Sequence, residues 1–257
     1  MQSLPLRQSP LLELRTLAKV PALLGAIAGY VDSCTFLGLF GLFVAQVTGS
    51  FVITGTELVI HDPGFLLKVL GIPFFLLGGV LTTLAVTVAI ARGQSALLWA
   101  FGLEGFFIAC FLIMGVIGAP FHAPNGASEL ATAFFGLSAM GVQSATVRLL
   151  MQGVPSTNVM TTNTTLIAIE GTRMMLAWGH LQRMPDDTAS ATQFIGRLRE
   201  FSTLVFIALG FLSGTILGAF AFQAVGFWCL LLPALAMLSL SVWAALSAPN
   251  KRTMSAA

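Results

Sequence analysis

The feature that most constrains this chain is a series of apolar runs, each long enough to cross a lipid bilayer. A bilayer core of about 30 Å requires roughly 20 apolar residues in a helix. Four runs of this length are almost purely apolar, and they occupy residues 65–91, 96–119, 203–222 and 225–248. Two less pure runs, residues 17–43 and 130–151, contain Asp32 and Arg148. The sequence therefore predicts an all-α, polytopic membrane bundle with about six spans.

The composition supports the same fold class. Hydrophobic residues make up 56% of the chain and charged residues only 9%, whereas a soluble domain carries about 25% charged residues. One buried core in a chain of 257 residues could not hide so many apolar groups, so lipid must cover the remainder. We expect one membrane domain over residues 1–257 and the lipid bilayer as its main partner. The net charge of +2, without clustered basic residues, argues against nucleic-acid binding.

Two further segments, residues 44–60 and 155–180, are apolar only in patches. Their Thr, Asn, Gln and Glu side chains are costly against lipid tails. These segments could form short interrupted or re-entrant helices, because polar backbone is tolerated at membrane depth where other spans shield it. Alternatively, each segment could cross the membrane, which would give eight helices.

The basic residues favour six spans over eight, because Lys and Arg in short loops favour the cytoplasmic side. With six spans, every Lys and Arg except Lys68 falls on that side, whereas eight spans move Arg92 and Arg148 outside. Either count places both termini in the cytoplasm. The cytoplasmic parts would then be an arm at residues 1–16, a polar loop at 181–200 and a tail at 249–257.

The two polar segments resemble each other and lie in corresponding parts of the chain, residues 17–119 and 128–248. The matched pairs are Thr48 with Thr161, Gly49 with Thr162, Ser50 with Asn163, Glu57 with Glu170 and, after a one-residue gap, Gly29 with Gly141 and Asp32 with Ser144. This pattern predicts an internal duplication. Three spans in each half would invert the second half, as in many secondary transporters, whereas four in each half would make the repeats parallel.

Three stretches of sequence carry a family resemblance. They are GYVDSCTFLGLFGLFVAQVTGSFV from Gly29, MGVQSATVRLL from Met140 and the Thr/Asn-rich segment after Pro155. Through these stretches the chain resembles the YoaK-like family of uncharacterised bacterial membrane proteins, and the resemblance covers nearly its whole length. Members carry a Gly-x-x-Asp-Ala signature, then Thr-Gly-Asn and later Thr-Gly-Thr, from which Ser50 and Thr162 depart here. The resemblance implies about six spans in the bacterial cytoplasmic membrane and no particular activity.

Asp32 is the leading candidate for a functional residue. It lies inside an apolar run, where a carboxylate is costly unless it is paired, protonated or hydrated. The alternative is that Asp32 fixes packing by accepting hydrogen bonds from nearby helix ends. With Asp32 we expect Thr48, Ser50, Thr161 and Asn163 to bind a small polar solute, although their hydroxyl and amide groups could equally cap short helices.

We expect four other charged residues to form a coupling or polar network. Glu57 and Glu170, related by the repeat, could face each other across a pseudo-two-fold axis. Arg173 follows Glu170 at the i, i+3 spacing of a helical ion pair. Glu104 lies in an apolar run, where it could pair with Arg92 or reach water at the interface.

Small residues at four-residue spacing predict close helix packing. Gly25 and Gly29 lie in the first run, and Gly210, Gly214 and Gly218 share one face of a later run. Such faces let helix backbones approach each other. The contact could lie within the chain or join copies in a homo-oligomer.

Motifs for cofactor or metal chemistry are missing from the sequence. Cys34, Cys110 and Cys229 stand alone inside apolar runs, which is typical of buried small hydrophobic residues. The three His residues lack metal-ligand spacing, and no nucleotide-binding or hydrolase motif occurs. We therefore expect no cofactor, no metal and no enzymatic activity.

The leading functional hypothesis is a secondary transporter that moves a small polar solute or ion by alternating access between two duplicated halves. A non-catalytic assembly protein, docking through the glycine face of residues 210–218, is the first alternative. An intramembrane enzyme using Asp32 or a glutamate with His122 is the second.

Overall fold

The computed structural model describes residues 10–60, 64–184 and 187–247, and its helices carry almost all of them. The helices, in chain order, are α1 (Pro10–Gly38), α2 (Val47–Ile60), α3 (Phe65–Ala91), α4 (Ala96–Gly118), α5 (Ala127–Leu150), α6 (Met160–Arg183), α7 (Thr188–Val225), the 3-10 helix η1 (Gly226–Leu230) and α8 (Leu231–Leu246). Within these described ranges there is no strand. The predicted all-α class is therefore confirmed.

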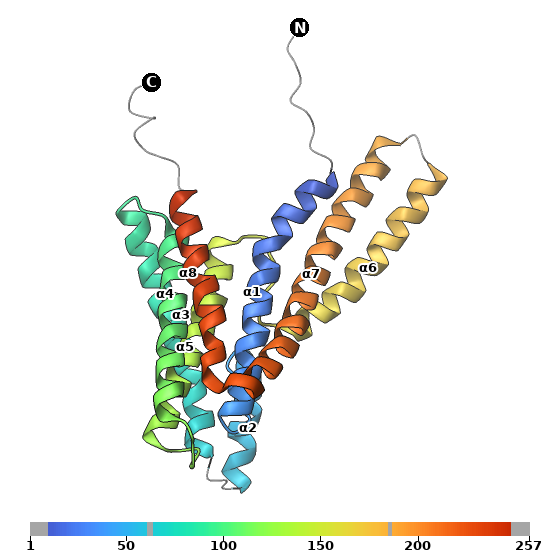
Figure 1. The fold of residues 1–257 in the computed structure, drawn as a ribbon. Coiled ribbons are helices and arrows are strands. Elements are labelled where there is room, and N and C mark those ends of the chain that lie inside the picture. The colour runs from blue at the N-terminus through green and yellow to red at the C-terminus, as the bar shows by residue number, and fades with distance from the viewer. Residues whose placement is uncertain (1–9, 61–63, 185–186, 248–257) are drawn as a thin grey trace, which may run out of the picture.

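The helices form an upright bundle whose two ends can be told apart in Figure 1. We call the end where α1 begins the upper end. The end of α8, the α3–α4 turn and the α6–α7 hairpin also lie at or beyond the upper end, whereas the end of α2 and the α4–α5 connection lie at the lower end (Figure 1). The expected tail 249–257 and residues 1–9 of the expected arm lie outside the described residues.

Five segments are long and apolar enough to cross a membrane. They are Lys19–Gly38, Phe65–Ala91, Ala96–Gly118, Ala127–Leu150 and Thr188–Leu246. The last segment contains both α7 and α8, and the chain reverses direction between them at η1 (Figure 1). Gly226, which opens η1, has a φ of 59° that favours glycine. The chain is thus a multi-pass helical membrane protein.

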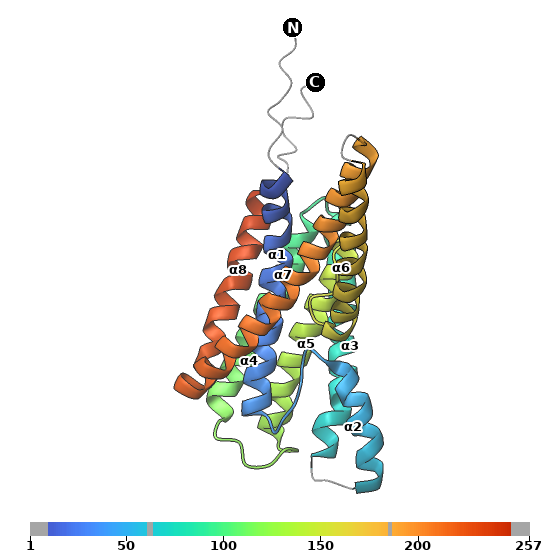
Figure 2. The ribbon, with the colours of Figure 1, turned by 90° about the vertical axis from the view of Figure 1, so that its right-hand side faces the viewer.

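Both polar segments consist of a return loop followed by a helix. After α1 ends, residues 39–46 turn back along the bundle, and α2 then descends to the lower end (Figure 2). After α5 ends, residues 151–159 turn back in the same way before α6 rises to the upper end. α2 has only 14 residues, which is too few to cross a bilayer.

Two boundaries differ from the sequence-based expectation. The segment 155–180 is not an interrupted helix, because α6 runs without a break over Met160–Arg183. The polar loop expected at 181–200 is also wrong, since only residues 184–187 separate α6 from α7. Asp187 ends this short connection and accepts hydrogen bonds from the backbone N–H groups of Ala189 and Ser190. A capped helix N-terminus therefore replaces most of the expected loop.

Two pairs of helices cross at very close range. In the α1–α7 pair, a Cβ added to Gly29 would overlap the carbonyl oxygen of Phe211, and one added to Gly214 would overlap that of Ala26. In the α3–α5 pair, glycines make the same kind of contact with backbone carbonyls. Helix backbones can approach this closely only where a side chain is missing.

The glycines singled out in the sequence lie at the α1–α7 contact. Gly25 and Gly29 face α7, whereas Gly210, Gly214 and Gly218 face the backbone of α1. The face of residues 210–218 is therefore covered within the chain. The expectation that it docks a partner protein is wrong, because α1 already occupies it.

Two adjacent glycines on α3 provide a matched test of close packing. A Cβ at Gly78 would overlap the carbonyl oxygen of Ser138 on α5, whereas a Cβ at Gly79 would meet open space. We expect Gly78→Ala to lower the free energy of unfolding by about 1–3 kcal/mol, as overpacking does. Gly79→Ala should leave stability unchanged or slightly raised, because alanine favours helix. Thermal unfolding of the purified variants in detergent would measure the difference, and equal stabilities would contradict the contact.

Candidate functional site

Asp32 is buried at the point where the first return loop comes back against α1. Its side chain is 3% exposed. Oδ1 accepts hydrogen bonds from the backbone N–H groups of Val44 at 2.7 Å and Ala45 at 2.8 Å. Oδ2 accepts one from Nε2 of Gln46 at 3.2 Å. Asp32 thus satisfies donors of a loop that could not find water at this depth.

A small groove lies directly beside Asp32. Its volume is about 230 Å³. We call it the Asp32 groove, and its lining includes Asp32, Ser33, Phe36, Gln46, Phe211 and Thr215. Polar groups from α1, the return loop and α7 therefore face a space that is otherwise aromatic and apolar. Such a mixture is typical of small-molecule sites, in which a few polar groups fix orientation inside an apolar wall.

The second return loop is held by an amide instead of a carboxylate. Gln143 on α5 is fully buried, and its Nε2 donates to the backbone oxygen of Leu24 at 2.8 Å and to Oγ1 of Thr157 at 2.9 Å. Its Nε2 also lies 3.4 Å from Oδ1 of Asn158. Gln143 therefore ties the second loop to α1 as well as to α5.

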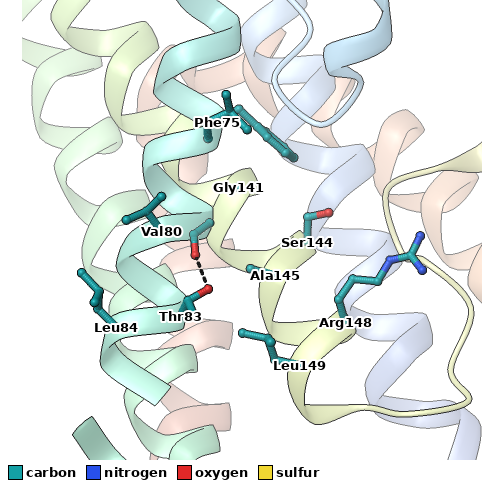
Figure 3. A pocket seen from close by; sticks show the side chains of 11 residues that line it. Phe75, Val80, Thr83, Leu84, Gly141, Ser144, Ala145, Arg148 and Leu149 are labelled. Carbon is teal, nitrogen blue, oxygen red and sulfur yellow. Dashed lines mark hydrogen bonds between the residues drawn. The ribbon is translucent and has the colours of Figure 1, made fainter. Parts of the chain in front are cut away.

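A larger groove separates the outer faces of α3 and α5. It lies in the later part of both helices, toward the upper end, which is at the bottom of Figure 3. Its volume is about 540 Å³. We call it the Arg148 groove, and its lining includes Leu76, Gly79, Thr83, Leu84, Ser144 and Arg148. The walls are mainly apolar, and Arg148 is its single charged side chain.

The predicted solute-binding residues do not meet in one chamber. Among the described residues, α2 and α6 share no contact. Thr48 on α2 and Thr161 on α6 are both exposed. Ser50 is buried against Gly71 of α3, and Asn163 is 1% exposed and donates to the backbone oxygen of Ser156 at 2.6 Å. The expectation of a chamber shared by the two polar segments is therefore wrong, because the helices of the two segments, α2 and α6, do not meet.

The acidic residues of the expected network have separate surroundings. Glu170 accepts hydrogen bonds from Arg173 at 2.7 Å and from Arg197 of α7 at 3.1 Å. The pair of Glu170 with Arg173 is the i, i+3 ion pair that the spacing predicts. The helices that carry Glu57 and Glu170, α2 and α6, share no contact among the described residues. The side chain of Glu57 itself lies outside the described residues.

Glu104 is the least explained charged residue in the structure. It is fully buried in α4, and neither carboxylate oxygen has a hydrogen-bond partner among the described groups. The expected partner, Arg92, instead stacks over the ring of Trp99 at 5.8 Å. A carboxyl group in such a place is neutral or finds a partner in another state of the protein.

The structure also brings together residues that the sequence had suggested were isolated. The Sγ atoms of Cys34 and Cys229 lie 3.3 Å apart, and both thiols are free and buried. Gln143 and Gln46 were not selected as site residues from the sequence. The signal that could have found Gln143 is an amide inside the apolar run 130–151, where a polar side chain requires a partner.

The charges around Glu170 predict a pH dependence of the α6–α7 hairpin. Desolvation raises the pKa of this carboxyl, but the hydrogen bonds and charges of Arg173 and Arg197 outweigh it and lower the pKa below its usual value. A lowered carboxyl pKa gives stability that is present above the unfolded value of about 4.3 and is lost as the pH falls through the folded value.

We therefore expect amide hydrogen exchange in α6 to rise between pH 7 and about pH 3, after correction for the intrinsic rate. Glu170→Gln should already exchange faster at pH 7 and respond less to acid. Glu200→Gln is the control, because Glu200 is an exposed partner of Arg197. Identical pH profiles for wild type and Glu170→Gln would contradict this role.

Comparison with known proteins gives a family but no relative of established activity. A family model described as "Protein of unknown function (DUF1275)" matches residues 20–243. No curated protein matches the chain, and no solved structure matches it. The matched residues include both return loops and both grooves. The chain therefore belongs to the DUF1275 family, the YoaK-like family of multi-pass membrane proteins.

Proposed function

We propose that this protein is a secondary transporter of a small polar solute in the bacterial cytoplasmic membrane, built from two inverted halves. The observation that carries the proposal is a correspondence between two helix crossings. α1 crosses α7 through glycines that meet carbonyl oxygens, and α5 crosses α3 through glycines that meet carbonyl oxygens at matching positions. Inverted halves of this kind are a common plan of secondary transporters.

The correspondence extends to single residues. One constant sequence offset relates α1 to α5, where Ala26 is equivalent to Ser138 and Gly29 to Gly141. A second constant offset relates α3 to α7, where Phe75 is equivalent to Phe211 and Gly78 to Gly214. Each glycine meets the carbonyl oxygen of the equivalent partner in its own pair. Four matched contacts at fixed offsets support a duplicated scaffold.

The two grooves follow the same offsets. Their equivalent lining residues are Asp32 and Ser144, Phe36 and Arg148, Leu37 and Leu149, Thr215 and Gly79, and Ala219 and Thr83. The Asp32 groove belongs to the crossing of α1 with α7, and the Arg148 groove to the crossing of α3 with α5. Each half therefore contributes one element to each groove.

The distribution of basic residues supports six crossings, made by α1, α3, α4, α5, α7 and α8. Arg92 in the α3–α4 turn, Arg148 near the end of α5 and Arg183 at the end of α6 lie toward the upper end (Figure 1). Lys68 lies in the first turns of α3, toward the lower end. An upper end that faces the cytoplasm agrees with the preference of basic residues. Three crossings in each half then invert the second half.

The Asp32 groove is the solute site that we propose. It combines a buried carboxylate, an amide and two hydroxyl groups with aromatic walls. A carboxylate in this setting can hold a cation or exchange a proton, which is the chemistry of a coupling site. Asp32 is also bonded to the return loop, so a change in its charge would reach α2 through the backbone.

An enzymatic role has less support from this groove. General acid–base chemistry of the kind expected for an intramembrane enzyme needs two converging titratable groups. Asp32 is the single titratable side chain that lines the groove. His122 lies in the α4–α5 connection, where its backbone N–H donates to Glu129 at 3.2 Å, and it does not line the groove.

Solute uptake into proteoliposomes tests the transport proposal. Asp32→Asn removes the charge but keeps an oxygen that can accept from Val44 and Ala45. Because hydrogen bonds to charged groups contribute about 1.5–3 kcal/mol, we expect transport to fall roughly tenfold or more. Uptake is compared per amount of folded protein, because the bonds from the return loop to Asp32 weaken as well. Asp187→Asn is the matched control, since Asp187 caps the exposed start of α7.

The transport result is decisive in either direction. Wild-type protein that moves no member of a broad panel of metabolites and ions would contradict the proposal. Undiminished uptake by Asp32→Asn would remove Asp32 from the solute site.

Labelling of single cysteines tests the six-span topology. In a variant with Cys34, Cys110 and Cys229 replaced by Ser, cysteines are added at Gln94 in the α3–α4 turn and at Ala123 in the α4–α5 connection. Six crossings predict that a membrane-impermeant maleimide labels Ala123→Cys in intact cells and Gln94→Cys only after permeabilisation. Eight crossings predict the reverse, because they place the α3–α4 turn outside.

A further inference from the structure

The Arg148 groove has the dimensions of a site for one lipid chain. Its wall on α3 extends from Phe75 to Leu84, which is about 14 Å at the helical rise of 1.5 Å per residue. One leaflet contributes about half of the roughly 30 Å hydrocarbon core. Leu76, Val80 and Leu84 are all more than half exposed along this wall. The groove therefore offers an apolar channel of about one leaflet in depth.

The positively charged side chain of Arg148 lies where the groove comes nearest to the upper end of the bundle. Figure 3 shows Arg148 beside Leu149 and across from Leu84, while Phe75 lies at the opposite end of the groove. Within the described part of the chain, Arg148 has no ion pair and no hydrogen-bond partner, and its side chain is exposed. One turn earlier on α5, Ser144 adds a hydroxyl group to the same lining (Figure 3).

The comparison between the two grooves shows that the positive charge is specific to one of them. Where the Asp32 groove has Asp32 and Phe36, the Arg148 groove has Ser144 and Arg148. Both differences make the second groove more positive. A neutral apolar groove would serve for general contact with lipid tails, so the arginine adds a preference for an anion at the groove end.

We propose that the Arg148 groove binds one anionic phospholipid of the leaflet at the upper end. The Arg148 guanidinium pairs with the phosphate, because the planar fork of its N–H donors suits bidentate bonding. Ser144 donates to a second headgroup oxygen, and an acyl chain lies along Leu76, Val80 and Leu84. Basic pockets between membrane helices bind anionic headgroups in this manner. The site is separate from the proposed transport site, and it would stand if the transport proposal failed.

Native mass spectrometry of the protein released from nanodiscs tests the proposal. The nanodiscs contain equal amounts of phosphatidylglycerol and phosphatidylethanolamine in both leaflets, so the result does not depend on orientation. We expect wild type to retain phosphatidylglycerol preferentially. Arg148→Gln should reduce this retention roughly fivefold, the equivalent of one basic residue at an anionic surface. Arg92→Gln, which removes another basic residue toward the same end, should leave it unchanged.

A second variant separates the chain-binding groove from the charge. A side chain at Gly79 would enter open space inside the groove, so Gly79→Leu fills the channel without moving the backbone. It should reduce retention of both lipids. Gly179→Leu is the control, because Gly179 on α6 also faces open space.

Three outcomes would overturn the proposal. They are equal retention of both lipids by wild type, undiminished phosphatidylglycerol on Arg148→Gln, and displacement of the lipid by millimolar inorganic phosphate. The last result would identify a site for a free anion instead of a lipid.

Discussion

The close crossing of backbones in the α1–α7 and α3–α5 pairs is the constraint on which the rest of the structure depends. Lipid tails are as apolar as leucine side chains, so helices in a membrane gain little from hiding apolar surface and must gain from close packing. Glycines let carbonyl oxygens approach the facing helix at Gly29, Gly214, Gly78 and Gly141. These crossings hold α1 and α5 at the centre of the bundle, and the return loops are then enclosed against them.

Enclosure creates the need for the buried polar residues. A return loop at membrane depth has backbone N–H and carbonyl groups that find no water, and each unsatisfied group is costly. Asp32 accepts from two N–H groups of the first loop, and Gln143 binds side chains of the second. Asp32 thus has a structural role in addition to the transport role that we propose. A carboxylate bonded directly to the return loop is well placed to couple its charge to a change of shape.

Hydropathy could predict the crossings and the polar segments, because span length and the cost of polar groups in lipid are local properties of the sequence. The same reasoning could not predict which helices pair, since the crossing of α1 with α7 joins residues from opposite halves of the chain. Three predictions from the sequence were therefore wrong: that the glycine face of residues 210–218 docks a partner, that the polar segments share a chamber, and that Cys34 and Cys229 are isolated from each other. Asp32 was identifiable as a charge in an apolar run, whereas its partners Val44 and Ala45 contribute only backbone groups, which no sequence pattern reveals.

The two halves differ where their side chains reach a groove and agree where their backbones touch. At the closest backbone contacts, Gly29 is equivalent to Gly141 and Gly78 to Gly214, because any larger residue would push the helices apart. At the grooves, Asp32 is paired with Ser144 and Phe36 with Arg148, and neither exchange alters the packing of the crossing. In the duplicated scaffold that we propose, helix packing alone does not require the two grooves to differ in charge. The difference in charge agrees with the two ligands that we propose: a solute or cation for the acidic groove and an anionic headgroup for the basic one.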